Sequence, residues 1–246
     1  MYKDFIGIFD SGVGGLTIYK EIRDLLPNEN ILYVGDSKNA PYGNKSEEEV
    51  KKCIFEIVDN MVNEGVKAIV FACNTATSIA VNDVREKYKD LIIIGIEPAI
   101  KLALDNGNNK ILVLATTNTL KLEKYKNLVE RLDAEENLIP IDLPGLSSLI
   151  DNGDLNNKEI DLLLKNKLKP YIGIVDSIVL GCTHYPFVKD KIQSILNVPI
   201  YDGSVGTAKE LKRRLEEKNL LSNNEGITIF KSTGKELDYK KMINLL

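Results

Sequence analysis

Short apolar runs rich in β-branched residues alternate along the chain with amphipathic segments of helical spacing. This rhythm is typical of the strands and helices that build parallel α/β sheets. The connecting segments are predicted to be largely helical, which places the chain in the α/β class. Strands are predicted at residues 6–9, 31–34, 68–72, 91–96, 110–115, 137–143, 177–181 and 227–231.

The best-defined helix is predicted at residues 46–64. Ser46 and Glu49 form a capping-box signature, Gly65 follows as a terminator, and apolar residues recur every three or four positions. Cys53 falls on this apolar stripe, so we expect its thiol to be a packing residue.

The two halves of the chain repeat one coarse pattern. Residues 6–10, residues 31–35 and Cys73 correspond to residues 111–115, residues 137–141 and Cys182 at offsets of 105, 106 and 109 residues. A nearly constant offset predicts two pseudosymmetric parallel-sheet α/β domains that face each other across a central cleft.

Two cysteines occupy matching places in this repeat, in residues 68–75 (AIVFACNT) and 177–184 (SIVLGCTH). Each closes a short apolar run, so each thiol is expected at the carboxyl end of a buried strand, facing the cleft. Two facing acid/base groups can take a proton from one side of a carbon and return one from the other. His184, the single histidine of the chain, follows Cys182 by two positions and is a further acid/base candidate.

The loops between strands and helices carry ligand-binding chemistry. In residues 10–17 (DSGVGGLT) the glycines allow close approach of the backbone, and the amides of a helix start favour an anion. This loop matches neither the dinucleotide fingerprint nor the P-loop. A rigid bend is predicted at Pro41, Tyr42 and Gly43, where the aromatic ring could form one wall of a site for a small polar ligand. Hydroxyl and amide donors after both cysteines suit a carboxylate.

Composition narrows the class of protein. With 246 residues, of which 43% are hydrophobic, the chain can bury a sizeable core. A net charge of −4 without a basic stripe argues against a nucleic-acid partner. We expect no signal peptide, because the N-terminus passes straight into a strand, and no membrane span, because no apolar run is long enough. The three cysteines lack a disulfide-framework spacing, so we expect reduced thiols and a cytoplasmic location. No metal is expected, since Cys182 and His184 lack a further Cys/His cluster.

Six motifs that occur in order span almost the whole chain: residues 9–17 (FDSGVGGLT), 41–43 (PYG), 73–76 (CNTA), 95–98 (GIEP), 115–119 (ATTNT) and 181–186 (GCTHYP). Together they resemble the glutamate racemases of the cofactor-independent aspartate/glutamate racemase family. The resemblance implies interconversion of L- and D-glutamate without a cofactor, supply of D-glutamate for peptidoglycan, and a homodimer. It also implies one domain of residues 1–97 plus 207–246 and a second of residues 98–206.

The resemblance also implies roles for individual residues. Cys73 would act on the D enantiomer with help from Asp10, and Cys182 on the L enantiomer with help from His184. Where the family usually has a glutamate, this chain has the shorter Asp151, whose carboxylate would serve the His184 side by orienting the imidazole or binding the substrate ammonium. The alternative is that Asp151 only turns the chain before Gly153. The positions that match the family's substrate contacts are Asp10, Ser11, Pro41, Tyr42, Gly43, Asn74, Thr75, Thr116, Thr119, Thr183 and His184.

The protonation state of Cys73 poses a difficulty. A free cysteine has a pKa of about 8.5, so half-ionisation at pH 7 needs roughly 2 kcal/mol of preferential stabilisation. Helix-start amides at Asn74 and Thr75 would supply part of it, whereas an ionised Asp10 would oppose it.

Three alternatives stay open. A racemase for aspartate or another acidic amino acid would use the same residues. A nucleotide-dependent kinase would explain residues 10–17 but leave both cysteines unused. A non-catalytic amino-acid-binding protein would have no need of thiols facing its ligand.

Overall fold

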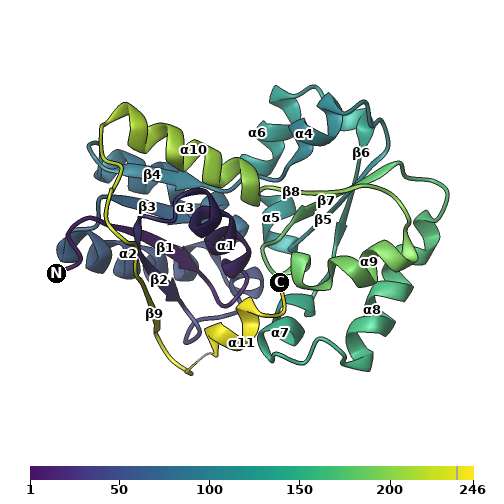
Figure 1. The fold of residues 1–246 in the computed structure, drawn as a ribbon. Helices are drawn as coiled ribbons and strands as arrows, with labels where there is room; N and C mark the ends of the chain where they lie inside the picture. The colour runs from purple at the N-terminus through teal and green to yellow at the C-terminus, as the bar shows by residue number, and fades with distance from the viewer. Residues whose placement is uncertain (237) are drawn as a thin grey trace.

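Two parallel β-sheets, one for each half of the repeat, form the framework of the computed structural model, which describes residues 1–236 and 238–246 (Figure 1). Every strand pairing in both sheets is parallel. The first sheet has the order β4-β3-β1-β2-β9 and the second β6-β5-β7-β8. The strands are β1 (Phe5–Asp10), β2 (Asn30–Gly35), β3 (Ala68–Phe71), β4 (Ile92–Gly95), β5 (Ile111–Ala115), β6 (Leu138–Asp142), β7 (Ser177–Gly181), β8 (Ile200–Asp202) and β9 (Thr228–Ser232).

The strand order confirms the predicted fold class. In the first sheet β2, β1, β3 and β4 lie side by side in the same order as β6, β5, β7 and β8 in the second, and β9 adds one strand beside β2. Each predicted strand agrees with an observed one to within one residue at either end. Strand β8 was not predicted, because three residues are too few to show a periodic pattern.

Helix α2 (Glu47–Glu64) confirms the predicted capping. The Ser46 hydroxyl accepts a hydrogen bond from the Glu49 N–H at 3.3 Å, and the Glu49 carboxylate accepts one from the Ser46 N–H at 3.0 Å. Gly65 ends the helix with a φ of 88°, in the left-handed region that glycine adopts easily. Cys53 is half-buried on the apolar face of this helix, against the core under α2.

Helices cover both faces of each sheet. On the first sheet, α1 (Leu16–Leu25) and α10 (Ser204–Glu217) pack on one face, and α2 and α3 (Asn74–Lys87) on the other. On the second sheet, α7 (Leu146–Asp151), α8 (Lys158–Leu168) and α9 (Lys189–Ile195) lie opposite α4 (Ile100–Asp105) and α6 (Glu123–Arg131). The remaining helices are α5 (Thr117–Lys121) and α11 (Tyr239–Ile243), with short 3-10 turns at Tyr42–Asn44, Glu135–Asn137, Lys169–Tyr171 and Tyr185–Val188.

One apolar core runs through both halves of the molecule. Alternate residues of β1 point to opposite faces, so Ile6 and Ile8 join the core under α1 whereas Phe5 and Phe9 join the core under α2. The core under α1 continues through buried residues of α7, α8 and α9. The chain crosses from one sheet to the other twice, after β4 and after β8. Because the two sheets also share this core, packing contributes to their relative position.

After β8 the chain returns to the first sheet. Helix α10 packs against α1 and β4 (Figure 1). The segment that follows is anchored by Lys67 and Glu29, which form an ion pair of 2.6 Å and whose side chains are 10% and 1% exposed. The Lys67 ammonium donates to the Leu220 carbonyl of this segment at 2.7 Å. Glu29 also accepts a hydrogen bond from the Ser222 N–H at 2.8 Å. The division into residues 1–97 plus 207–246 and residues 98–206 stays a prediction, with the membership of the two sheets in its favour.

Among the residues that the structure describes, no helix combines the length and apolar composition that crossing a membrane would need.

Loss of the Glu29 carboxylate is expected to destabilise the fold strongly. The Glu29→Ala variant leaves the largely buried Lys67 ammonium without its counter-ion, which costs about 3–5 kcal/mol. Urea unfolding followed by circular dichroism measures the change in the free energy of unfolding. Asp105→Ala is the matched control, since it breaks the exposed Lys101–Asp105 pair and should cost less than about 1 kcal/mol. Equal costs for the two variants would contradict the anchoring role of Glu29.

Candidate active site

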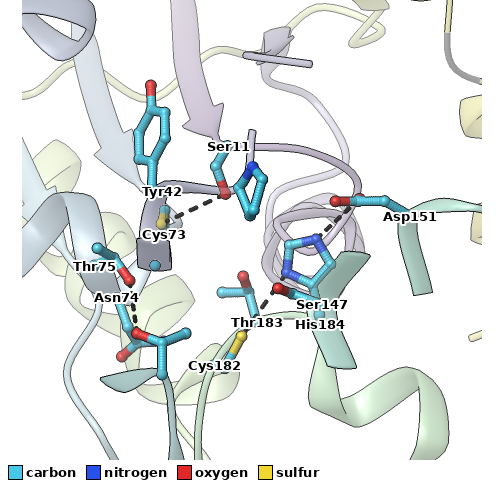
Figure 2. A pocket seen from close by; sticks show the side chains of 13 residues that line it. Ser11, Tyr42, Cys73, Asn74, Thr75, Ser147, Asp151, Cys182, Thr183 and His184 are labelled. Carbon is cyan, nitrogen blue, oxygen red and sulfur yellow. Dashed lines mark hydrogen bonds and ion pairs between the residues drawn. The ribbon is translucent and has the colours of Figure 1, made fainter. Parts of the chain in front are cut away.

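A cleft lies at the carboxyl ends of the central strands, between the two sheets (Figure 2). The empty space in it, including the part open to solvent, amounts to about 350 Å³. Cys182 comes directly after β7, and Cys73 is the second residue after β3, so the two thiols lie at equivalent ends of equivalent strands. The lining residues are Ser11, Pro41, Tyr42, Gly43, Cys73, Asn74, Thr75, Thr116, Ser147, Asp151, Cys182, Thr183 and His184.

The cleft brings together most of the residues that the sequence singled out. Asp10 and Thr119 are buried behind its wall, and the other predicted residues line it. Ser147 lines the cleft and was not predicted. It precedes Asp151 by four residues on α7, so the two share one face of that helix. That spacing is the signal that could have found Ser147.

Cys73 is the N-cap residue of α3. Its sulfur accepts a hydrogen bond from the Ala76 N–H at 3.4 Å, and its thiol donates to the Ser11 hydroxyl at 3.8 Å. Burial, together with the charge of Asp10, raises the pKa of Cys73 to about 12, although the Ala76 N–H opposes this shift. The start of α3 therefore stabilises the thiolate through the Ala76 N–H, in the first turn of the helix. Because its pKa is nevertheless raised, Cys73 is protonated at neutral pH in this structure.

Asp10 is fully buried at the end of β1. Its carboxylate accepts hydrogen bonds from the Gly12 N–H at 2.8 Å and from the Thr183 hydroxyl at 3.1 Å. Burial raises the pKa of Asp10, while the charge of His184 and the Gly12 N–H act against the rise. Asp10, the acid on the Cys73 side, therefore accepts hydrogen bonds from loops that follow strands of both sheets.

His184 stands between a thiol and a carboxylate. Its Nδ1 is 3.8 Å from the Cys182 sulfur, and its Nε2 is 3.0 Å from an oxygen of Asp151 (Figure 2). Burial alone would lower the pKa of His184, but the charge and hydrogen bond of Asp151 raise it well above its ordinary value. Burial would likewise raise the pKa of Asp151, and His184 lowers it instead. The pair is therefore ionised at neutral pH, with an N–H of the imidazolium directed at Cys182.

The glycine-rich loop after β1 binds an anion, as predicted, but this anion is the carboxylate of Asp151. The Val13 N–H donates to Asp151 at 3.1 Å. A Cβ on Gly12 would lie 2.5 Å from an oxygen of Asp151, and one on Gly14 would lie 2.5 Å from the Thr183 hydroxyl. The glycines thus admit side chains of the second sheet to the backbone of the first. This use of the Val13 amide leaves it unavailable to the nucleotide phosphate of a kinase.

The cleft contains polar side-chain atoms that could hydrogen-bond a ligand. The side-chain oxygen and nitrogen of Asn74 are both buried and make no hydrogen bond. A buried polar group left unpaired costs about 1–3 kcal/mol, which favours a ligand that pairs with it. The Thr75 and Thr116 hydroxyls lie 3.0 Å apart. The Tyr42 hydroxyl instead donates to Asp36 at 2.6 Å and points away from the other labelled side chains, so Tyr42 offers its ring to the cleft (Figure 2).

Within the described part of the chain, no three His, Cys, Asp or Glu side chains are grouped so as to hold a metal ion.

Comparison with known proteins adds independent information. The model of the family described as Asp/Glu/Hydantoin racemase matches residues 6–211. A glutamate racemase of Clostridium perfringens is 48% identical over 247 residues, which cover 98% of this chain and 94% of that protein. The structure of a glutamate racemase isoform from Bacillus anthracis has a TM-score of 0.85 at 34% identity and covers 94% of this chain and 89% of its own. That of the Francisella tularensis glutamate racemase in complex with D-glutamate has a TM-score of 0.86 at 31% identity, covering 100% and 94%.

The charge of His184 can be measured directly, because it is the single histidine of the chain. In an NMR titration we expect its pKa to lie well above 6.5 in the wild type. In Asp151→Asn it should fall, since the carboxylate that opposes burial most strongly is then absent. Asp154→Asn removes an exposed carboxylate nearby in the sequence and should leave the titration unchanged. A wild-type value near 6.5 would contradict the ion pair.

Proposed function

Because the chain belongs to the Asp/Glu/hydantoin racemase family, we propose that it interconverts L- and D-glutamate by moving a proton between Cα and two thiols. The observation that carries this proposal is the pair Cys73 and Cys182, two buried thiols from opposite sheets that line one cleft. Glutamate is favoured over aspartate because the relatives that match nearly the whole chain are glutamate racemases.

The two thiols divide the reaction between the two faces of Cα. With D-glutamate, the Cys73 thiolate takes the Cα proton and the Cys182 thiol gives its proton to the opposite face. With L-glutamate the roles are reversed. Each turnover leaves one sulfur protonated and the other deprotonated, so the pair returns to its first state only after proton exchange or turnover in the other direction.

The polar wall of the cleft stabilises the intermediate. Removal of the Cα proton places negative charge on Cα and its carboxylate, and fixed donors aimed at that carboxylate lower the barrier. The unpaired amide of Asn74 and the hydroxyls of Thr75 and Thr116 are such donors. Because they are already buried and held by the fold, little reorganisation accompanies the proton transfer.

Ionisation of Cys73 is the costly step on the first side. A pKa of about 12 places the thiolate on the order of 7 kcal/mol above the thiol at pH 7. The substrate ammonium offsets part of this cost through its positive charge. Asp10 accepts the proton that Cys73 releases while Cys73 takes the Cα proton, which avoids an isolated buried thiolate. Before this step the Cys73 thiol donates to the hydroxyl of Ser11, the neighbour of Asp10 in the sequence. On the second side, the imidazolium of His184 supports the Cys182 thiolate by a charge-assisted hydrogen bond.

We also propose the cellular setting that the chemistry suits. D-Glutamate made by this reaction would feed peptidoglycan synthesis. The reaction needs reduced thiols, which favours the cytoplasm. A homodimer is proposed from the resemblance to the family, and analytical ultracentrifugation tests it.

Racemisation in deuterated water is expected to place deuterium at Cα of the product. The returning proton comes from a thiol that exchanges with solvent, whichever enantiomer is supplied. Circular dichroism follows the loss of optical activity, and mass spectrometry follows the label, with pure protein and no added cofactor. Inversion without label would contradict two-base transfer, and binding without either signal would favour a binding protein.

Cys73→Ser and Cys182→Ser should each abolish racemisation of both enantiomers. Serine has nearly the size of cysteine but is a far weaker base at neutral pH. Thermal unfolding checks that both variants remain folded. Cys53→Ser is the matched control, because Cys53 packs against the core under α2, and it should retain activity. Full activity in either cleft variant would remove that thiol from the mechanism.

A further inference from the structure

The Thr183 side chain contacts the opposite domain. Thr183 follows Cys182 and is 4% exposed. Its hydroxyl donates to Asp10 at 3.1 Å, and its carbonyl oxygen lies 3.4 Å from the Thr17 hydroxyl. Gly14 has no room for a Cβ on this side, because that atom would lie 2.5 Å from the Thr183 hydroxyl. Thr183 is thus held tightly against the loop that follows β1.

Each oxygen of the Asp10 carboxylate depends on a different donor. The Gly12 N–H, in the loop after β1, donates a hydrogen bond to Oδ1. The Thr183 hydroxyl, on the opposite side of the cleft, donates one to Oδ2. Within the described residues, Thr183 is the one side chain that donates a hydrogen bond to Asp10. A fully buried carboxylate relies on such donors, since water does not replace them.

This contact has a counterpart in the reverse direction. Asp151 belongs to the second sheet's side of the cleft and accepts a hydrogen bond from Val13 of the first. Asp10 belongs to the first and accepts one from Thr183 of the second. Each acid that assists a thiol is therefore held by a donor from the opposite domain.

We propose that Thr183 is a positioning residue, which fixes the Asp10 carboxylate so that the acid serving Cys73 is complete only while the two domains are in contact. The inference rests on the proposed racemase function. It assigns the Thr183 hydroxyl to Asp10, whereas the family resemblance implies only a contact with substrate.

The hydrogen bond matters because Asp10 must be ionised to accept a proton from Cys73. The titratable groups that face Asp10 are His184, Asp151, Cys73, Tyr33 and Tyr239. Of these, His184 favours the charge on Asp10, and Asp151 disfavours it. A donor to the ionised carboxylate also favours the charge. Without the Thr183 hydroxyl, Asp10 keeps its proton to a higher pH.

The test compares Thr183→Val, which removes the hydroxyl at nearly constant shape, with Thr183→Ser, which keeps it. We expect Thr183→Val to lower kcat/KM at neutral pH roughly tenfold or more, as for loss of a hydrogen bond to a charged group. The acid limb of the pH profile should move upward by about one pH unit. Thr183→Ser should restore both quantities, and measurements from either enantiomer should agree.

Two further variants separate positioning from packing and from substrate contact. Thr17→Val removes another buried hydroxyl at the same interface, and its acid limb should stay in place. If Thr183 acts through Asp10, adding Thr183→Val to Asp10→Asn should lower the residual kcat/KM by much less than tenfold.

The outcomes are distinguishable. A higher KM for Thr183→Val with an unmoved acid limb, or full additivity with Asp10→Asn, would overturn the positioning role and leave the racemase proposal intact. A wild-type protein that racemises neither enantiomer would overturn the proposed function and this inference with it.

Discussion

The Asp151 carboxylate lies between the two domains, and the electrostatics of the cleft depend on its position. It accepts the Val13 N–H of one domain and contacts His184 of the other. A buried carboxylate and a buried imidazole would each be neutral alone, but in contact they stabilise each other's charge. The ionised His184 then directs an N–H at Cys182 and adds positive charge near Asp10. The glycines of the loop after β1 are explained by the same contact, since side chains there would exclude Asp151 and His184.

The backbone is nearly symmetric across the cleft, whereas the chemistry of its two sides is not. Equivalent strands deliver two thiols, but different structures follow them. Cys73 caps the 14-residue helix α3 and has an anionic neighbour, Asp10. Cys182 leads into a short 3-10 turn and has a cationic neighbour, His184. The helix start supports a thiolate that Asp10 opposes, and the imidazolium supports the other without a long helix. The same functional group therefore has an anionic neighbour on one side of the cleft and a cationic neighbour on the other.

The two segments in which the chain crosses between the domains are fixed by specific contacts. Glu97, at the first crossing, contacts Lys124 at 2.8 Å and Arg131 at 3.1 Å, both on α6. Gly203, at the second, has no space for a side chain, because a Cβ would lie 2.9 Å from Ile96. The two crossings therefore pack directly on each other beside the shared apolar core. In the proposed mechanism, proton transfer requires donor and acceptor at near-contact distance, so it depends on the orientation of the two domains.

The sequence alone determined every described strand except β8, the class of fold and the two thiols at strand ends, because these follow from local periodicity and from an internal repeat. It also predicted the capped helix α2, whose signals lie within a few residues of each other. Three features depended on tertiary structure. The occupation of the Val13 amide by Asp151, the contact of Thr183 with Asp10, and the place of Ser147 in the cleft each join residues more than 100 positions apart or depend on how α7 packs. No local pattern encodes such contacts, since they arise only when two separately patterned domains meet and bury their polar groups against each other.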